Sequence, residues 1–344
     1  MAKILVSDPT LRDGNHAVAH QLSIQNFTDY AIAAEAAHVP IVEVGHGNGL
    51  GASSLQVGQS SVSDHDMLAA VRERLSNSKL GIHVIPGFAT IKKDLEPALN
   101  LGVDVVRVAC HCSEADITQR HIAYVRERGK QVFGVLMMSH MLAPEQLAEE
   151  AVKMESYGAE AVIFMDSAGA FLPTDVASRV VALKNAVNIA IGFHAHNNLG
   201  MAIANSIAAL DKGASIVDGT ARGFGAGAGN AQLELLVAVM HKVGYETGID
   251  LYRMLDAADL AEKKIIPSIP TIKSTSIVSG LAGVFSGFAK HVDRVSLQFN
   301  VDARDIYFEL GKRKVIAGQE DLIIEVAQQL ASSGARQTER LVQK

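Results

Sequence analysis

The stretch "QVFGVLMMSHMLAPEQLAEEAVKMESYGAEAVIFMDSAG" (131–169) contains the pattern that decides the fold. It begins and ends with apolar, β-branched runs, and the part between them, 146–159, has helical spacing. The apolar residues that we expect to share one face of this helix are Leu147, Val152, Met154 and Tyr157. Gly158 is expected to cap its C-terminal end. Two strands joined by a helix predict a parallel β-α-β unit with a right-handed crossover.

The same alternation recurs along most of the chain. The strand-like runs lie at residues 3–8, 40–46, 80–87, 103–111, 131–140, 160–169, 189–197 and 214–223. Eight such units, each followed by a helical segment, match a (β/α)₈ TIM barrel better than an open doubly wound sheet. The open sheet remains the structural alternative, because a sequence does not show whether a sheet closes.

The pattern breaks after the eighth unit. "KKIIPSIP" (263–270) carries two prolines, and the segments that follow look helical but have no strand partner. The clearest of these segments are 285–299 and 320–334. We therefore predict a catalytic barrel at residues 1–262 and a C-terminal helical appendage, which would contact a partner, at 263–344.

Composition excludes several classes of protein. The chain has 344 residues, 48% of them hydrophobic and 20% charged, as in an ordinary soluble protein. A net charge of −6 and an aromatic content of 5% argue against nucleic acid and anionic membranes as partners. The amino terminus enters a strand pattern at once, which leaves no room for a signal peptide. Two cysteines form no disulfide framework, so we expect a cytoplasmic enzyme.

Polar side chains are concentrated where the apolar runs end. The first run is followed by Arg12, Asp13 and His16 in "DPTLRDGNHA" (8–17). Other run ends carry Glu43, His46, Ser139, His140, Asp166, Ser167, His194 and His196. In a barrel the carboxyl ends of all strands converge, so residues far apart in sequence would meet in one site.

The "HAH" of residues 194–196 is the most specific element of this set. On a strand, residues i and i+2 point to the same side, so His194 and His196 would project together. Asp13 is the best-placed carboxylate, because one strand separates the first and seventh strands of a closed barrel. Two imidazoles and a carboxylate suit a first-row divalent metal. A His-x-His pair alone is often only hydrogen-bonded, but the cluster after strand one favours the metal site.

Two further residues suggest the chemistry beside such a metal. The fixed charge and several donors of Arg12 suit stabilisation of a developing enolate. The alternative for Arg12 is a salt bridge with Glu43 or Asp166. His16 is suited to act as a general base near neutral pH, and its alternative is a solvent-facing loop histidine.

Two other motifs carry less weight. The glycine-rich "GFGAGAGN" (223–230) lacks the Lys-Ser/Thr ending of a phosphate loop and follows the last strand, so we expect a tight turn there with Asn230 near a helix start. Cys110 and Cys112 share a strand face and are predicted to be buried packing residues.

Six ordered motifs carry a family resemblance: "DPTLRDGNHAVAHQ", "RVACHCSEAD", "LMMSHM", "DSAGA", "GFHAHNNLG" and "GAGAGNAQLE". Together they resemble the 4-hydroxy-2-oxovalerate aldolases, which belong to the metallolyase superfamily with isopropylmalate synthase and hydroxymethylglutaryl-CoA lyase. The resemblance runs nearly end to end and includes "ELGKRKVIAGQEDLIIEVA" (309–327) in the appendage.

The resemblance implies an activity and a set of roles. The ligands of manganese(II), or of magnesium or cobalt, would be Asp13, His194 and His196. Arg12 would stabilise a pyruvate enolate, His16 would take the 4-hydroxyl proton as the C3–C4 bond breaks, and Ser167 would contact the pyruvate moiety. The substrates would be a 4-hydroxy-2-oxo acid, or pyruvate and an aldehyde, in the catabolism of aromatic hydrocarbons. An acylating aldehyde dehydrogenase would be the partner, in a homo- or hetero-oligomer.

The chain departs from the family pattern around the aldehyde site. Phe285 in "AGVFSG" replaces a tyrosine, and His83 and Ile85 in "HVIPGFAT" replace leucines. Asn197 stands where a third histidine is common, and Asn48 where an aspartate is common. We therefore predict a pyruvate aldolase with an altered, larger or more polar aldehyde pocket.

Two rival functions remain at this stage. A Claisen-type acyl-CoA condensing or cleaving enzyme of the same superfamily usually carries Gln or Glu shortly after "RDG", so His16 argues against it. A non-catalytic partner of an aldehyde dehydrogenase has no need for an intact set of Arg12, Asp13, His16, His194 and His196.

Overall fold

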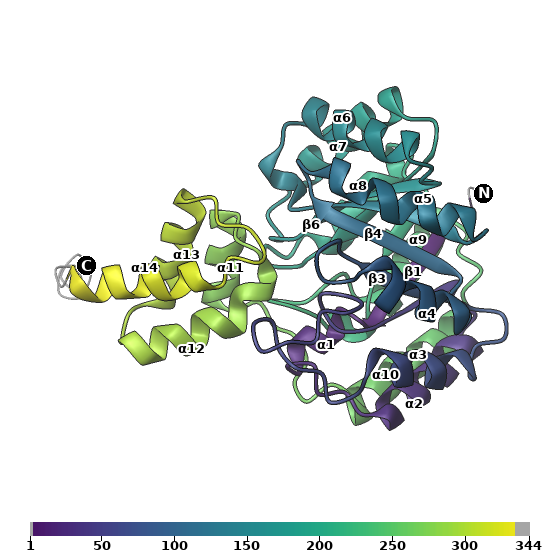
Figure 1. Ribbon diagram of the computed structural model, residues 1–344, viewed down its shortest axis with the longest axis horizontal. Helices are drawn as coiled ribbons and strands as arrows, with labels where there is room; N and C mark the ends of the chain where they lie inside the picture. Colours follow the sequence, from purple (N-terminus) through teal and green to yellow (C-terminus); the bar gives the residue numbers. More distant parts are fainter. Residues whose placement is uncertain (1–2, 334–344) are drawn as a thin grey trace.

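The computed structural model describes residues 3–333, which form a closed barrel of parallel strands followed by a group of helices (Figure 1). The strands are β1 Leu5–Leu11, β2 Ile41–Val44, β3 Lys79–Val84, β4 Val105–His111, β5 Gln131–Met137, β6 Ala161–Asp166, β7 Ala190–Ala195 and β8 Ile216–Asp218. Each strand pairs in parallel with the next, and β8 pairs with β1. The predicted TIM barrel is thus confirmed, and the open sheet is excluded.

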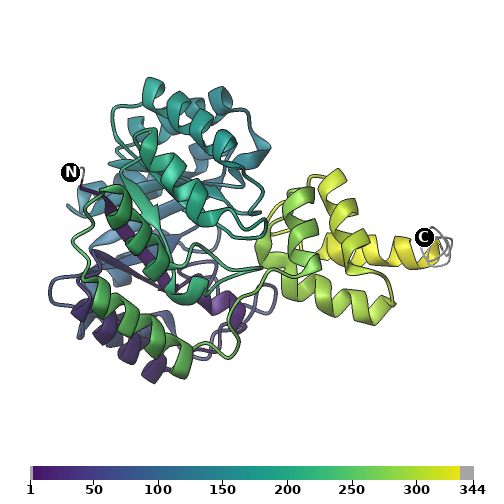
Figure 2. The same cartoon turned by 180° about the vertical axis from the view of Figure 1, so that it is seen from behind.

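Helices cover the outside of the barrel (Figures 1 and 2). They are α2 Ile24–Ala36, α3 Asp64–Arg72, α4 Glu96–Asn100, α5 Gln119–Glu127, α6 Pro144–Ser156, α7 Pro173–Ala186, α8 Ala202–Asp211, α9 Leu233–Val243 and α10 Leu251–Lys264, while the short α1 Gly14–Ala17 lies at the barrel mouth. One apolar cluster fills the space between helices and strands, and a smaller one, which includes Val105, Val135 and Ile163, lies among the strands. Within residues 3–333, no helix is long and apolar enough to cross a membrane.

The helix in the opening stretch, α6, buries a slightly different face from the one predicted. Leu147 and Met154 are fully buried, but Val152 is 42% exposed, so its assignment to the buried face was wrong. The buried face instead continues through Ala151, because residues four and seven positions after Leu147 lie on the same side of a helix. Gly158 follows the helix end with a φ of +105°, as expected of a C-terminal glycine.

The appendage is a separate helical body with its own core. It contains α11 Ser274–Ala282, α12 Ala289–Phe299, α13 Ala303–Lys312 and α14 Asp321–Ser332. Its apolar centre is distinct from that of the barrel and includes Phe288, Val292 and Ile306. The division into residues 1–262 and 263–344 stays a proposal; it falls within the last turn of α10, and residues 334–344 lie outside the described part.

Candidate active site

The loop after β1 begins the site. The strand runs to Leu11, three residues further than predicted, and the backbone then turns because the amides of Arg12 and Asp13 both donate to the carbonyl of Pro9. The short helix α1 follows and carries His16. This turn directs Arg12 and Asp13, each 3% exposed, into the barrel mouth.

Asp13, His194 and His196 come together at this mouth. One ligand atom from each of the three buried side chains lies within 4.8 Å of the others. Strand β7 ends at Ala195, so His196 lies just beyond the strand, where it forms an isolated bridge with Asn230. The two imidazoles nevertheless adjoin each other, with ring centroids 5.1 Å apart.

The donor atoms of this triad fit a divalent cation. His194 Nδ1 lies 2.8 Å from the carboxylate of Asp218 and must carry the proton there, because an ionised carboxylate only accepts hydrogen bonds. Its Nε2 lies 4.0 Å from the Asp13 carboxylate, and neither this atom nor Nδ1 of His196 has a hydrogen-bond partner among residues 3–333. Buried nitrogens without a partner beside a carboxylate are the arrangement that a metal ion would complete.

Asp13 is held as a carboxylate. Burial opposes its ionisation, but the charge of Arg12 and the neighbouring imidazoles outweigh burial and lower the pKa of Asp13. Arg12 Nη1 donates to Oδ2 at 2.8 Å, and Asn230 Nδ2 donates to Oδ1 at 2.9 Å. A Cβ atom at Gly225 would lie 2.5 Å from Oδ1, so glycine is needed for this loop to approach the carboxylate.

Arg12 has one donor group left over. Its Nε donates to Glu43 at 2.5 Å, which confirms that salt bridge and not the one with Asp166, and its Nη1 contacts Asp13. Nη2 is buried and has no hydrogen-bond partner in the described part of the chain. Because Arg12 lines the cavity beside the triad, this nitrogen is available to a substrate oxygen.

His16 is partly buried and lines the same cavity. Burial, more than any other influence, lowers the pKa of His16 to about 4, so the imidazole is neutral at pH 7 and able to accept a proton. Its ring lies against Gly47, where a Cβ atom would be only 2.6 Å from it. His16 is therefore not the freely solvated loop histidine of the alternative reading.

The predicted substrate-binding residues Arg12, His83, Ile85, Ser167 and Phe285 all line this cavity of about 30 Å³, whereas Asn197 and His194 do not. Its lining comprises Arg12, Asp13, His16, Gly47, Asn48, His83, Ile85, Met137, Met165, Ser167, His196, Ala226 and Phe285. Ser167 Oγ accepts a hydrogen bond from the amide of Met138, which leaves its hydroxyl proton free to donate. Nδ1 of His83 is buried without a hydrogen-bond partner in the described residues.

A second cavity of about 290 Å³ adjoins the first. His16, Asn48 and Phe285 line both, so these three side chains separate the inner cavity from the outer one. The outer cavity reaches helix α12 of the appendage at Lys290 and Arg294. The route into the site therefore runs between the barrel and the appendage.

Other polar residues at run ends have structural roles. Asp166 accepts hydrogen bonds from the amides of Ala170 and Phe171, and burial raises the pKa of Asp166 to about 6. His140 bonds to the carbonyl of Gly283, and His46 to that of Gly58. None of these three lines the inner cavity.

The sequence reading missed Asp218, Asn230 and Arg107. Asp218 ends strand β8, so the rule that drew attention to the other strand ends also applied to it. Arg107 interrupts the apolar run "VVRVAC", which was a detectable signal. Asn230 gave no signal, because its contact depends on the path of the glycine-rich loop.

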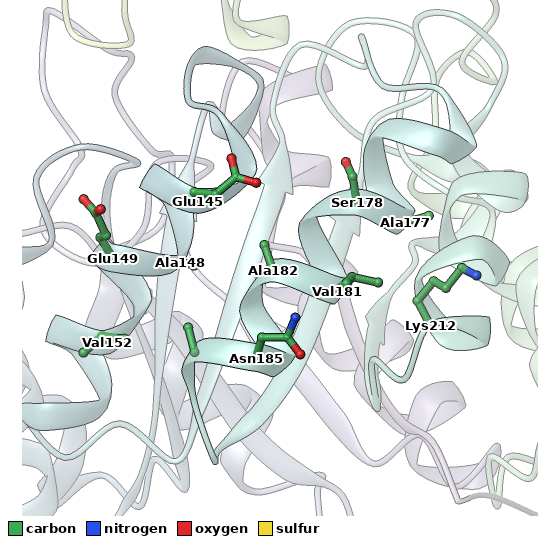
Figure 3. A pocket seen from close by; sticks show the side chains of 11 residues that line it. Glu145, Ala148, Glu149, Val152, Ala177, Ser178, Val181, Ala182, Asn185 and Lys212 are labelled. Atoms are coloured by element: carbon green, nitrogen blue, oxygen red, sulfur yellow. The ribbon is translucent and has the colours of Figure 1, made fainter.

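A larger surface groove, of about 670 Å³, lies elsewhere (Figure 3). It runs between α6 and α7 on the outside of the barrel, with Val152 and Val181 on its walls and Lys212 at one end. It contains none of the predicted site residues and lies away from the carboxyl ends of the strands, so it is not the candidate active site.

Comparisons with known proteins find similarity over nearly the whole chain. A family model described as HMGL-like matches residues 3–261, and one described as a DmpG-like communication domain matches residues 270–332. A curated 4-hydroxy-2-oxovalerate aldolase from Spirochaeta aurantia is 64% identical over 333 residues, which cover 97% of this chain and 98% of that protein.

The chain belongs to the 4-hydroxy-2-oxovalerate aldolase family. This is a family of carbon–carbon lyases, so the non-catalytic reading is set aside. A second aldolase of the family, from Pectobacterium atrosepticum, is 62% identical over 338 residues and covers 98% of each chain. Among solved structures, the carboxyl transferase domain of Rhizobium etli pyruvate carboxylase with pyruvate and biocytin has a TM-score of 0.82 and covers 96% of this chain and 61% of that one. Its sequence identity is only 16%, so the likeness shows the fold alone.

Proposed function

We propose that the chain is a divalent-metal-dependent aldolase that cleaves 4-hydroxy-2-oxo acids to pyruvate and an aldehyde, or forms them from these products. The observation that carries the proposal is the triad of Asp13, His194 and His196, which has two buried nitrogens without a hydrogen-bond partner among residues 3–333 and adjoins the cavity lined by Arg12 and His16. Manganese(II) is the proposed ion, and magnesium or cobalt are its alternatives. When bound, the ion would act as a Lewis acid toward the 2-oxo group of the substrate.

His16 and Arg12 have complementary tasks in cleavage. The neutral imidazole of His16 accepts the proton of the 4-hydroxyl group as the C3–C4 bond breaks and C4 becomes the aldehyde carbonyl. The electron pair of that bond remains on the pyruvate fragment as an enolate. Arg12 Nη2 donates to the oxygen where this negative charge develops, and a proton taken up from solvent at C3 then gives pyruvate. The Ser167 hydroxyl donates to the pyruvate moiety.

The aldehyde half of the pocket is proposed to be more polar than is usual in the family. His83 contributes a buried nitrogen without a partner, next to Ile85 and Phe285. Burial, aided by the charge of Arg12, lowers the pKa of His83, so its neutral ring offers one donor and one acceptor. We expect aldehydes larger than acetaldehyde, or bearing a hydroxyl group, to be accepted; a condensation profile with a sharp optimum at acetaldehyde would contradict this.

We further propose that the appendage contacts an acylating aldehyde dehydrogenase in a homo- or hetero-oligomer. The support is the match of residues 270–332 to the DmpG-like communication domain. The opening of the outer cavity beside α12 would place the aldehyde near such a partner. A cytoplasmic location is consistent with Cys110 and Cys112, which are free and buried.

The test is metal-dependent release of pyruvate from a 4-hydroxy-2-oxo acid. We expect chelator treatment to abolish release, manganese to restore it, and Asp13→Asn to abolish it even with manganese present. Asp166→Asn is the matched control, because Asp166 is also a buried strand-end carboxylate but lies outside the triad; it should retain metal-dependent activity. Full activity after chelation, or release of free CoA from an acyl-CoA substrate instead of pyruvate, would refute the proposal.

A further inference from the structure

A set of buried charges lies inside the barrel next to the triad, with Arg107 at its centre. Arg107 projects from β4 and is fully buried. Its Nη2 lies 2.6 Å from Asp218, and its Nη1 lies 2.9 Å from Glu43. Because β4 and β8 lie on opposite sides of the closed barrel, the side chain crosses the interior to reach Asp218.

These contacts extend into a closed ring. The two partners of Arg107 each hold one residue of the site: Glu43 contacts Arg12 Nε at 2.5 Å, and Asp218 contacts His194 Nδ1 at 2.8 Å. The ring closes at Asp13, which pairs with Arg12 at 2.8 Å and lies 4.0 Å from His194 Nε2. Its members in order are Arg12, Glu43, Arg107, Asp218, His194 and Asp13. One guanidinium therefore links the arginine of the site to a proposed metal ligand.

The charges of this ring suit a role in the site better than a role in stability. Buried ion pairs are seldom more stabilising than apolar packing of the same volume, and apolar side chains such as Val105, Val135 and Ile163 fill another part of the barrel interior. The ring holds one more carboxylate than guanidinium, an excess that a bound cation would balance. A guanidinium also holds two carboxylates from different strands in a fixed geometry, which a lysine does not reproduce.

We propose that Arg107 is a positioning residue for both halves of the site. Through Asp218 it fixes the orientation and the protonated nitrogen of His194, and through Glu43 it fixes Arg12 beside the substrate oxygen. The inference rests on the proposed function, because His194 needs this orientation only if it binds a metal. It predicts that metal affinity and turnover decline together when Arg107 is changed.

Cobalt(II) is the probe, because its visible spectrum reports the geometry of its ligands. In Arg107→Lys we expect cobalt affinity to fall by about 10-fold to 100-fold and the bound spectrum to change. We expect kcat to fall similarly, with a smaller change in KM. The matched control is Arg179→Lys: Arg179 is 8% exposed, and among residues 3–333 its guanidinium hydrogen-bonds only to the backbone carbonyls of Ser139, Asp175 and Leu142 while it stacks on Phe171. This control should keep the wild-type cobalt spectrum and kcat even if its melting temperature falls.

If Arg107→Lys does not fold, Asp218→Asn tests the same link, and we expect the same weakened affinity and altered spectrum. A folded variant at either position that matches the wild type in affinity, spectrum and kcat overturns the inference while leaving the proposed function in place. Wild-type protein that binds no cobalt overturns both.

Discussion

The mouth of the barrel and the helical appendage differ in what fills their interiors. The mouth buries ionised groups, among them Arg12, Asp13 and Glu43, none more than 3% exposed. The appendage buries an apolar cluster and keeps ion pairs such as Arg313–Glu325 at its surface. Apolar burial stabilises a fold, whereas buried charges contribute little net stability and are retained where they serve a site.

The two regions meet through the segment between α11 and α12 and through the first turn of α12. The amide of Ser286 donates to the carbonyl of Ser167 at 2.9 Å, and Lys290 Nζ donates to the carbonyl of Ala17 at 2.7 Å. Phe285 from the same segment lines the inner cavity. The barrel thus supplies the polar groups of the site, and the appendage supplies one wall.

After the abolished activity expected of Asp13→Asn, the largest expected effect is at His16. His16→Ala should lower kcat for cleavage by roughly 10²- to 10⁴-fold, because it removes the proton acceptor for the 4-hydroxyl group. Exchange of the C3 protons of pyruvate with solvent deuterium, followed by NMR, should persist, since forming the enolate does not involve that hydroxyl. Loss of both activities to the same degree would show that His16 does more than accept this proton.

Arg12→Lys should lower kcat by about 10²- to 10³-fold, the usual loss when a donor to a developing oxyanion is removed. A lysine keeps a charge near Glu43 and Asp13 but does not offer the fixed donor that Nη2 provides. In contrast with His16→Ala, this variant should also lose deuterium exchange into pyruvate. Exchange at the wild-type rate would contradict the role given to Arg12.

Ile306→Ala tests the apolar side of the comparison. Ile306 is fully buried in the appendage core, and its truncation should lower the free energy of unfolding of that core by roughly 2–5 kcal/mol. Ile163→Ala in the barrel interior is the matched control for a similar loss there. Chemical denaturation of both variants measures these losses of stability. In a separate cobalt titration, Ile306→Ala should give the wild-type spectrum. An altered cobalt spectrum would mean that the two regions are not separable.

Acid should destabilise the barrel through buried histidines. Burial lowers the pKa of His46 and of His140 to about 4, from an ordinary 6.5. Between pH 4 and pH 6.5 the unfolded chain therefore binds more protons than the folded chain does. Their contribution to stability is therefore complete above pH 6.5 and is lost as the pH falls toward about 4. Asp8 and Asp166 act in the opposite sense, because burial raises the pKa of each to about 6.

The check is urea unfolding of the wild type and of His140→Gln across this pH window. The glutamine amide preserves a donor for the carbonyl of Gly283, so the variant should lose less stability on acidification than the wild type does. Parallel loss in the two proteins would mean that His140 does not contribute to the acid sensitivity.

The smallest effect is expected at Leu297, which is 85% exposed on α12. Leu297→Ser should change the free energy of unfolding by no more than about 0.5 kcal/mol, as is usual for an exposed position. Thermal unfolding checks this directly. A larger loss in the isolated chain would show that Leu297 is covered, for example by a second copy.

The fold was largely predictable because parallel strands, buried on both faces, form apolar runs. The end of β1 was missed because Asp8 and Thr10 look like turn residues; in the structure they bond to each other and to Tyr30. Val152 was misplaced because apolar character alone does not fix a helix face.

The site was predictable where residues followed strand ends. This rule selected Asp13, His194 and His196, which the structure brings together, while their roles stay predictions. It did not select Arg107, which acts from the middle of a strand, or Asn230, which reaches Asp13 only through the fold of a distant loop.

The most direct test of the central claim is a crystal grown with manganese and measured at the manganese absorption edge. The account predicts an anomalous peak within coordination distance of the Asp13 carboxylate and of one ring nitrogen each from His194 and His196. A fully active enzyme whose crystal shows no peak there, or whose manganese lies elsewhere, would contradict it.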